Sequence, residues 1–320
     1  MPQPDNAYCE VAVVIPTYNC ASSLPAAIES ALAQTYRDFR IYVIDDGSTD
    51  ATTDVLRQYA DRCVCLWQPN AGAAAARNRG IRESSSRYVA FLDADDLWHP
   101  TKLEQQLEVF NQRPDVGMVI SSFAMVMQDG HTGLPITRNY ICPELGDGGV
   151  FALLVTECFV ATPCAVVRRE VLEEVGVFNE ALAVCEDVNM WLRIASCWKM
   201  AALREVLVTV YKRVGSLSMV AGGTKIALAG KLAALQHVEA SCEDLSQSEQ
   251  RTLQRSLAVY YYKSGSARLT AGERESAREH LGIAIRYRPF YGLALVKFGG
   301  SLMPLSMFRF FAGIYHLGRR

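Results

Sequence analysis

The chain has 320 residues, half of them hydrophobic, a formal net charge of −2 and a sequence pI near 6.2. This length suits one large α/β domain with a smaller appended piece, or two domains. The slightly acidic balance argues against a basic surface for nucleic acid, so we expect no nucleic-acid partner. The ten cysteines include no Cys-x-x-Cys pair, which indicates reduced thiols in a cytosolic protein.

Residues 1–10 contain neither the basic segment nor the apolar core of a signal peptide. The chain also has no run of 18 uncharged apolar residues, the length that a membrane-spanning helix needs. We therefore expect a cytoplasmic protein without an integral membrane segment.

The first 112 residues alternate between buried-type strands and helices. Short loops join these elements, which predicts a mainly parallel, Rossmann-like sheet with helices on both faces and ligands at the carboxyl ends of the strands. Neither a dinucleotide-binding Gly-x-Gly-x-x-Gly motif nor a P-loop occurs. The expected strands are 10–16, 39–44, 62–67 and 87–92, and the expected helices are 22–34, 51–60, one opening at 70–80, and 101–112.

Acidic residues follow the second and fourth of these strands. Asp93, Asp95 and Asp96 place three carboxylates within four residues, and such groups repel one another unless a cation accepts their oxygens. A hard cation, Mg²⁺ or Mn²⁺, would suit them and would keep open positions for phosphate oxygens. The alternative for an isolated Asp-x-Asp-Asp is a solvated turn that precedes the next helix. After the second strand, helix capping would explain residues 48–50 but not Asp45 and Asp46.

The second half of the chain changes character. Residues 113–220 have an α+β pattern: we expect strands at 116–127, 165–168 and 200–211, a turn at 129–133, and a loop rich in Pro and Gly up to about 149. A short helix is expected at 169–175, and an apolar helix opens at Glu186-Asp187 and runs through Trp191. Taken alone, Asp187 would be assigned as the N-cap of that helix.

Residues 221–320 are predicted to be helical, with helices at 225–239, 248–264 and 273–287. Residues 261–289 resemble one tetratricopeptide-like hairpin, although a repeat array needs about three repeats. The tail, 290–317, is apolar, and we expect Gly299-Gly300 and Pro304 to divide it into short helices. It could pack on the preceding helices or dock on the anionic cytoplasmic leaflet, and both interpretations stay open.

Five motifs in order carry a resemblance to a known family. Together they resemble the family 2 glycosyltransferases of the GT-A fold over about 200 residues, ending near Met219. The motifs are VVIPTYN at 13–19, VIDDGSTD at 43–50, NAG at 70–72 with ARN at 76–78, FLDADD at 91–96, and ED at 186–187 with Trp191.

The resemblance implies a GT-A domain over 1–220, with a nucleotide-binding half at 1–112 and an acceptor half at 113–220, followed by a helical extension over 221–320. It also implies roles for individual residues. The expected nucleotide contacts are Pro16, Thr17, Tyr18, Asp46, Arg77 and Asp93; the expected metal ligands are Asp95 and Asp96; the expected general base is Asp187.

The implied reaction is metal-dependent, inverting transfer of one sugar from a nucleotide-sugar, most simply a UDP-sugar, to a glycan or lipid-linked acceptor in cell-surface polysaccharide or glycolipid synthesis. The Gln-x-x-Arg-Trp motif of processive relatives is missing after Asp187, which favours single addition. Many relatives have a histidine after the last strand; residues 211–218 have none, so we expect Lys212 or Arg213 to cover the diphosphate. Membrane contact through 290–320 would place the enzyme at the inner face of the plasma membrane.

Two other functions stay open at this point. A nucleotidyltransferase would also use acidic metal ligands on an α/β sheet, but it needs a glycine-rich N-terminal loop with a catalytic Arg or Lys, which residues 13–19 do not supply. A non-catalytic nucleotide-binding or partner-binding module, with the helical extension recruiting partners, is the second alternative.

Overall fold

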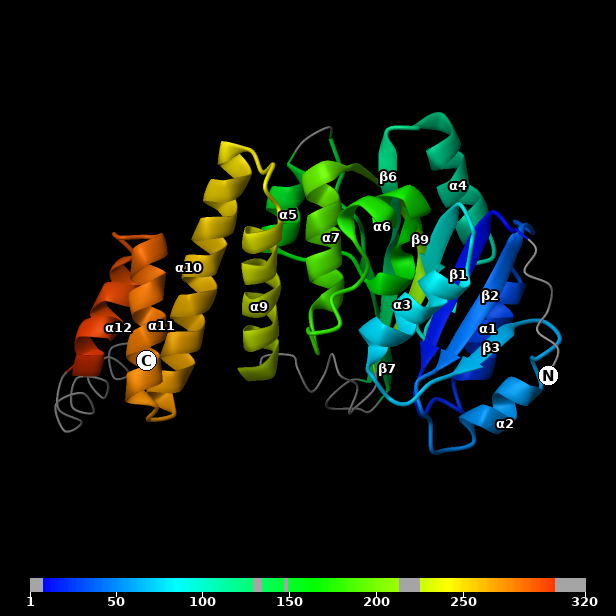
Figure 1. Cartoon of the computed structure of the whole chain (residues 1–320), viewed down its shortest axis with the longest axis horizontal. Coiled ribbons are helices and arrows are strands. Elements are labelled where there is room, and N and C mark those ends of the chain that lie inside the picture. Colours follow the sequence, from blue (N-terminus) through cyan, green and yellow to red (C-terminus); the bar gives the residue numbers. More distant parts are fainter. Residues whose placement is uncertain (1–7, 129–133, 147–148, 213–224, 303–320) are drawn as a thin grey trace. The chain divides into compact units, whose positions relative to one another are not determined.

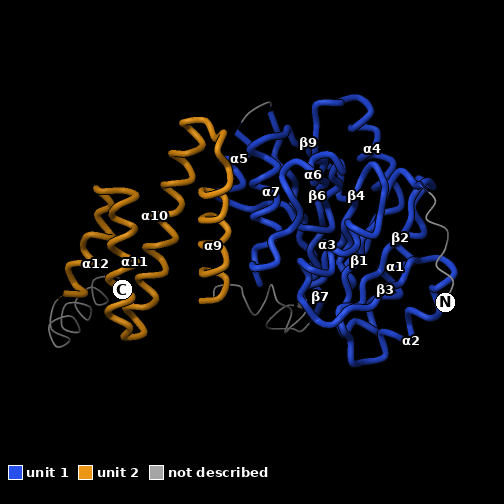
Figure 2. Tube along the Cα trace, viewed as in Figure 1, with its two compact units in different colours: residues 1–220 blue, residues 221–320 orange. Residues whose placement is uncertain are grey.

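The computed structural model describes residues 8–128, 134–146, 149–212 and 225–302. The chain separates into two compact units, residues Met1–Val220 and Ala221–Arg320 (Figure 2). None of the helices in these described ranges is both long and apolar enough to cross a membrane.

Unit 1 is built on one mixed sheet (Figure 1). The strand order over the described residues is β3-β2-β1-β4-β8-β6-β9-β5, with β7 paired to the outer part of β6. The first three neighbouring pairs are parallel, whereas β8 runs antiparallel to both β4 and β6. The strands are β1 (Val11–Thr17), β2 (Phe39–Asp45), β3 (Val64–Trp67), β4 (Tyr88–Phe91), β5 (Leu97–Trp98), β6 (Val116–Gln128), β7 (Pro135–Tyr140), β8 (Val166–Arg168) and β9 (Lys199–Lys212).

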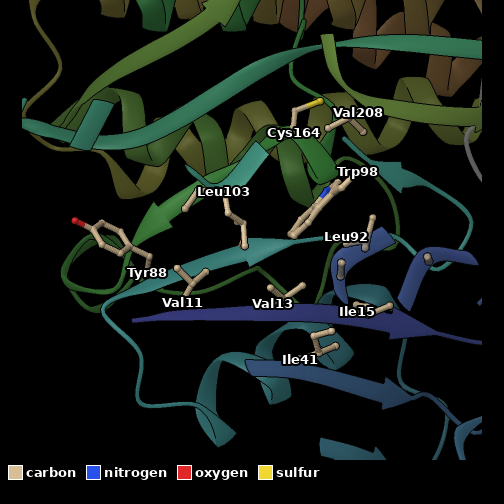
Figure 3. Close-up of a cluster of buried hydrophobic side chains, with 14 of the residues drawn as sticks. Val11, Val13, Ile15, Ile41, Tyr88, Leu92, Trp98, Leu103, Cys164 and Val208 are labelled. Atoms are coloured by element: carbon tan, nitrogen blue, oxygen red, sulfur yellow. The ribbon is translucent and has the colours of Figure 1, made fainter. Parts of the chain in front are cut away.

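Helices cover both faces of this sheet, and strand alternation decides which side chain meets which helix. Val11, Val13 and Ile15 of β1 point into the larger core, which holds residues of α1 and α4 (Figure 3). Ala12 points to the other face, toward Ala76 of α3. The helices of unit 1 are α1 (Leu24–Leu32), α2 (Thr52–Arg57), α3 (Ala73–Glu83), α4 (Lys102–Gln112), α5 (Val150–Thr156), the 3₁₀ helix η1 (Thr162–Cys164), α6 (Arg169–Val175) and α7 (Glu186–Cys197).

Helix α3 lies very close to β1, and a glycine makes this possible. A Cβ atom added at Gly80 would come within 2.5 Å of Val14 Cγ1. Only a residue without a side chain fits there. The contact holds α3 against the sheet. It thereby fixes the positions of Arg77 and Asn78, which lie within the preceding turn of the helix.

Unit 2 is helical throughout its described part, with α9 (Lys225–Ser241), α10 (Gln247–Thr270), α11 (Arg274–Tyr287) and α12 (Gly292–Leu302). A capping box formed by Ser246 and Glu249 begins α10. At Gly265, an added Cβ would approach Leu281 Cγ to 2.8 Å, so α10 and α11 pack closely there. The helical hairpin expected from residues 261–289 is therefore present.

Three local predictions were wrong or incomplete. The loop expected up to residue 149 contains β7, whose exposed residues lack an alternating pattern and which depends on pairing with β6 and on stacking of Tyr140 on Phe123. The two-residue strand β5 and the short helix α5 were missed, being too short to show a period. Helix α12 continues through Gly299-Gly300, because Ala294 and Ser301 are buried and Arg274 Nη2 donates to the Ser301 carbonyl at 2.7 Å. Pro304 and the expected turn at 129–133 lie outside the described residues.

Candidate active site

The carboxyl ends of β1, β2 and β3 form one edge of the sheet. Thr17, Asp45 and Trp67 are register partners at the last position of these three strands. The Asp46 amide donates to the Thr17 carbonyl at 2.9 Å, which continues the pairing one residue further. The loops after β1 and β2 therefore meet at this edge of the sheet.

Asp46 anchors the loop that follows β3. Its Oδ1 accepts hydrogen bonds from Gln68 Nε2 at 2.7 Å and from the Ala71 amide at 2.9 Å, and its Oδ2 accepts one from the Gly72 amide at 2.8 Å. The side chain is only 3% exposed. Donors within the protein thus engage both carboxylate oxygens, and contact of Asp46 with a nucleobase stays a prediction.

Asp45 has a structural role in the turn that follows β2. Its Oδ1 accepts from the Ser48 amide at 2.9 Å, and its Oδ2 accepts from Thr53 Oγ1 at 3.3 Å. These bonds hold the turn at Gly47 and the first turn of α2. Asp45 therefore stabilises this turn without capping α2, whose N-cap residue is Ala51.

Tyr18 is presented to solvent by a tightly bonded loop. Its neighbour Asn19 has a left-handed backbone (φ +52°), and Asn19 Oδ1 accepts from the Thr49 amide at 2.8 Å. The Asn19 amide donates to Ser48 Oγ at 2.9 Å, so the loops after β1 and β2 are joined. Tyr18 is 49% exposed. Thr17, the neighbouring expected nucleotide contact, is 3% exposed, and the structure describes no hydrogen-bond partner for the Thr17 hydroxyl.

Arg77 on α3 joins the loop after β4 to the start of α7. Its Nη2 lies 2.8 Å from Asp93 Oδ1, and its Nη1 lies 2.9 Å from Glu186 Oε1. Burial alone would lower the pKa of Arg77, but the charges of Asp93 and Glu186 outweigh it and raise the pKa above its ordinary value. Arg77 is 5% exposed and packs over the Phe178 ring. Its guanidinium is thus committed to two carboxylates, and its expected contact with base or diphosphate stays a prediction.

Asn78 makes a second connection between the same elements. Its Oδ1 accepts from the Phe178 amide at 2.9 Å, while its Nδ2 donates to the Phe178 carbonyl and to Glu180 Oε1, each at 2.8 Å. Both residues of the ARN motif therefore fix the segment that leads into α7. The sequence showed the motif, but nothing in it indicated that the partner would be this segment.

The three carboxylates after β4 have different surroundings. Asp93 faces Arg77, as above. Asp96 is 3% exposed, and its Oδ1 accepts from the Tyr211 amide of β9 at 2.9 Å. Asp95, between them, is partly exposed. Burial and the bond to β9 favour a structural role for Asp96, so its expected part in metal binding stays a prediction.

Glu186 and Asp187 occupy the first turn of α7, after Cys185 in a left-handed conformation (φ +63°). Burial and the neighbouring charge of Asp187 raise the pKa of Glu186, and its ion pair with Arg77 opposes that rise. Thr162 Oγ1 of η1 donates to Asp187 Oδ2 at 3.4 Å. Thr162 was missed because no sequence signal connects it with a residue 25 positions away.

The carboxylates after β4 are the candidate ligands of the predicted cation. Among the described residues, no three His, Cys, Asp or Glu side chains are grouped to hold a metal ion by themselves. Mg²⁺ and Mn²⁺ are commonly held by one or two carboxylates together with substrate phosphates, so Asp95 with its neighbouring carboxylates fits such a site chemically. Of the two cations expected over the diphosphate, Lys212 ends β9, and Arg213 lies outside the described residues.

Trp67 is a further exposed group at this edge that the sequence reasoning did not single out. It ends β3 in register with Asp45 and is 59% exposed. An exposed tryptophan at the end of a strand offers a flat apolar surface beside the loop that Asp46 anchors. Its position directly after an apolar strand was the available signal.

The sequence profile of Glycosyl transferase family 2 matches residues 12–176, just over half of the chain. The chain belongs to this family. The matched span includes the Asp46 loop, the ARN motif, the three carboxylates after β4 and Thr162. The enzyme class predicted from the motifs is therefore confirmed.

Relatives and solved structures agree with this assignment. The Escherichia coli UDP-Glc:alpha-D-GlcNAc-diphosphoundecaprenol beta-1,3-glucosyltransferase WfaP is 33% identical over 213 residues, which cover 65% of this chain and 79% of WfaP. The S. aureus TarS 1-349 complex with UDP-GlcNAc aligns with a TM-score of 0.65 at 17% identity, over 87% of this chain and 81% of that one. The Pyrobaculum calidifontis mannosyltransferase PcManGT, in complex with GDP-Man and Mn²⁺, aligns with a TM-score of 0.56 at 18% identity, over 97% of this chain and 86% of that one.

The chain spans less than two thirds of the length of some other relatives. The chain spans 32% of an uncharacterized glycosyltransferase of Rickettsia felis and 62% of one of Rickettsia prowazekii, with 30% and 29% identity. The two structural alignments, at 17% and 18% identity, show that the GT-A fold prediction is correct.

Proposed function

We propose that this family 2 glycosyltransferase transfers one sugar from a UDP-sugar to an acceptor hydroxyl, with a divalent cation and with inversion of the anomeric centre. The observation that carries the proposal is the double ion pair of Arg77, which holds Asp93 of the acidic loop after β4 beside Glu186-Asp187 at the start of α7. Donor-side and acceptor-side carboxylates thereby meet in one place.

On the donor side, Tyr18 is the exposed ring against which a nucleobase would lie, beside the loop that Asp46 fixes. Pro16 and Thr17 are the last two residues of β1, directly before Tyr18. UDP is proposed because WfaP and the TarS complex are both named with UDP-sugars, whereas PcManGT is named with GDP-Man. Asp95 would hold Mn²⁺ or Mg²⁺, with Asp93 and Asp96 next to it. When bound, the cation would neutralise charge on the leaving diphosphate.

On the acceptor side, Asp187 is the proposed general base. A hydroxyl is a weak nucleophile until a carboxylate takes its proton, and one positioned base contributes about 10²–10⁴-fold to the rate. Arg77 holds the neighbouring Glu186, and Thr162 bonds Asp187, so the base is fixed from both sides. One base and one leaving group imply a single displacement, which inverts the anomeric centre.

We further propose that the acceptor is a glycan or a lipid-linked sugar of cell-surface polysaccharide or glycolipid synthesis. WfaP is named for a diphosphoundecaprenol-linked acceptor, and the Bacillus subtilis relative TuaG is named for putative teichuronic acid biosynthesis. A cytoplasmic enzyme that works at the inner face of the plasma membrane fits such an acceptor.

The first experiment is calorimetric titration of UDP and of GDP, with and without Mn²⁺, into the wild type, Asp95→Ala and the matched surface control Asp61→Ala. We expect metal-dependent UDP binding that Asp95→Ala abolishes and Asp61→Ala retains. Preference for GDP would change the donor and keep the enzyme class. Binding of neither nucleotide by the wild type would overturn the donor proposal.

The base and the stereochemistry need separate measurements. With a UDP-sugar that the titration selects, Asp187→Asn is expected to lower kcat about 10²–10⁴-fold while UDP affinity stays within about twofold. Proton NMR of the first-formed product reports its anomeric configuration. Retention of configuration would contradict the single displacement.

A further inference from the structure

Helix α12 is apolar on two sides. Its inward residues Ala294 and Ser301 are 0% and 2% exposed and pack on the hairpin of α10 and α11. Lys297 is its only charged residue. A surface helix normally has one apolar and one polar face, and a helix that is apolar all round is covered on both sides.

The exposed apolar face, as we define it, comprises the outward residues Leu293, Leu295, Val296 and Leu302 of α12 together with Phe290 in the turn just before the helix. Phe290 is 93% exposed, Val296 74%, Leu302 60% and Leu293 55%. Leu293 and Val296 are three residues apart, so they lie on the same side of the helix. So many large apolar side chains in contact with water indicate a surface that another phase or molecule covers.

The segment that contains this face carries charge of one sign. Residues 280–302 contain Arg286, Arg288 and Lys297 and no Asp or Glu, in a chain whose net charge is −2. Arg286 and Arg288 are exposed, and Arg288 and Lys297 lie over the rings of Tyr291 and Tyr262 at 5.3 Å. Tyr287, between the two arginines, donates its hydroxyl to Glu239. Apolar side chains bordered by cations and tyrosines match the boundary between lipid tails and anionic headgroups.

We infer that the exposed apolar face of α12 is a docking surface for a bilayer that contains anionic lipid. Phe290, Leu293 and Val296 enter the acyl boundary, while Arg286, Arg288 and Lys297 stay with the headgroups. The positive charge decides between the possible occupants, because a second copy of this chain would bring the same three cations against themselves. The inference specifies the membrane contact suggested above and does not depend on the donor, the cation or the base.

The test is co-sedimentation of the full chain with vesicles of phosphatidylcholine alone and of phosphatidylcholine with phosphatidylglycerol. We expect binding only to the anionic vesicles, weakened by salt. Leu293→Glu combined with Val296→Glu is expected to reduce binding at least about tenfold, since it places two like charges among acyl chains. Ile226→Glu, at a 55% exposed site on α9 of the same unit, is the matched control and should bind as the wild type does.

A second pair separates the electrostatic from the apolar contribution. Arg286→Gln combined with Arg288→Gln is expected to weaken binding about fivefold for each charge removed, from about 1 kcal/mol per cation at an anionic surface. Circular dichroism and thermal melts confirm that each variant is folded. Wild type that binds both vesicle types equally, or neither at low salt, would overturn the inference.

Two further results would overturn it. One is unchanged vesicle binding by a folded Leu293→Glu/Val296→Glu protein. The other is conversion of a dimer to a monomer by these substitutions, measured by sedimentation velocity, without any effect on vesicle binding. UDP binding measured on the same preparations keeps this outcome distinct from a failure of the donor proposal.

Discussion

The loops after β2 and β4 look alike in the sequence, and the structure uses them differently. Each follows a buried strand and begins with acidic residues. After β2, Asp45 and Asp46 accept five hydrogen bonds from the protein, four of them from the loops at 48 and 68–72. After β4, Asp93 instead pairs with the buried Arg77, and Asp96 accepts from the Tyr211 amide of β9. Asp95 is partly exposed.

The difference shows that the partners of an acidic residue, rather than its place after a strand, indicate its role. A carboxylate surrounded by amide donors in a buried turn stabilises the loop around it. A partly exposed carboxylate beside other acids can accept a cation. On this criterion the loop after β2 is a scaffold, and the loop after β4 is the one that we propose binds the diphosphate of the donor.

The largest expected effect concerns Asp95. Asp95→Asn keeps the shape of the side chain and removes the charge, so we expect turnover of a UDP-sugar to fall about 10³-fold, because metal stabilisation of the leaving group amounts to several kcal/mol. Its melting temperature should stay near that of the wild type, since Asp95 is partly exposed. Steady-state kinetics and a thermal melt are the two measurements. A folded variant with undiminished turnover would remove the contrast between the two loops.

The second prediction concerns the scaffold loop. Asp46→Ala would leave three donors at Gln68, Ala71 and Gly72 without their buried acceptor, and we expect the free energy of unfolding to fall by about 3 kcal/mol. Denaturant titration measures it. Asp54→Ala removes an exposed carboxylate paired with Arg57 and should change stability by less than about 1 kcal/mol. Equal stability of the two variants would contradict the scaffold role.

How much of the structure can be predicted from the sequence depends on how far apart the interacting residues lie along the chain. Strand and helix identities in residues 10–112 follow from local periodicity, and they agree with the structure within a few residues. The family motifs also assign the Asp46 loop, Arg77 and Asp187 to one site, and this assignment stays a prediction. The partners of these groups could not be predicted, because Arg77 and Glu186 are 109 residues apart and meet only after the sheet forms.

Short elements and unusual pairings account for the other misses. The strand β5 has two residues, yet it pairs with β9 and positions Trp98 in the core. Glycines in α12 were taken as helix breakers from a cost of about 1 kcal/mol each, which packing of Ala294 and the bond to Ser301 offset. Such tertiary compensation leaves no local signal.

The third prediction concerns a lysine whose amine is buried in the segment after β4. Lys102, at the start of α4, is 0% exposed; its Nζ donates to Gln106 Oε1 at 2.7 Å and lies 4.1 Å from the Trp98 ring centroid. Burial lowers its pKa from 10.5 to about 7. Unlike Arg77, it has no described ion pair with a carboxylate.

A lowered lysine pKa makes the folded state release a proton that the unfolded state keeps, so the contribution of Lys102 to stability rises with pH between about 7 and 10.5 and is constant below and above that window. We expect a rise of about 1 kcal/mol between pH 7 and pH 8 in the wild type. Lys102→Met should flatten this part of the curve, whatever its absolute stability. Denaturant titrations at several pH values give the comparison, and parallel curves would show that Lys102 stays charged.

The smallest expected effect distinguishes the two interpretations of Asp96. Asp96→Asn keeps an oxygen that can accept from the Tyr211 amide, so a structural Asp96 predicts unfolding free energy within about 1 kcal/mol of the wild type and unchanged Mn²⁺ dependence of UDP binding. Asp96→Ala should lose about 1–2 kcal/mol, because the buried Tyr211 amide then lacks an acceptor. The sequence motif predicts the opposite pattern, in which loss of the charge raises the Mn²⁺ concentration needed for binding. Calorimetry on both variants decides between them. A higher Mn²⁺ concentration needed for UDP binding by a fully stable Asp96→Asn protein would identify Asp96 as a metal ligand beside Asp95, so that the carboxylates after β4 would serve metal binding rather than two separate roles.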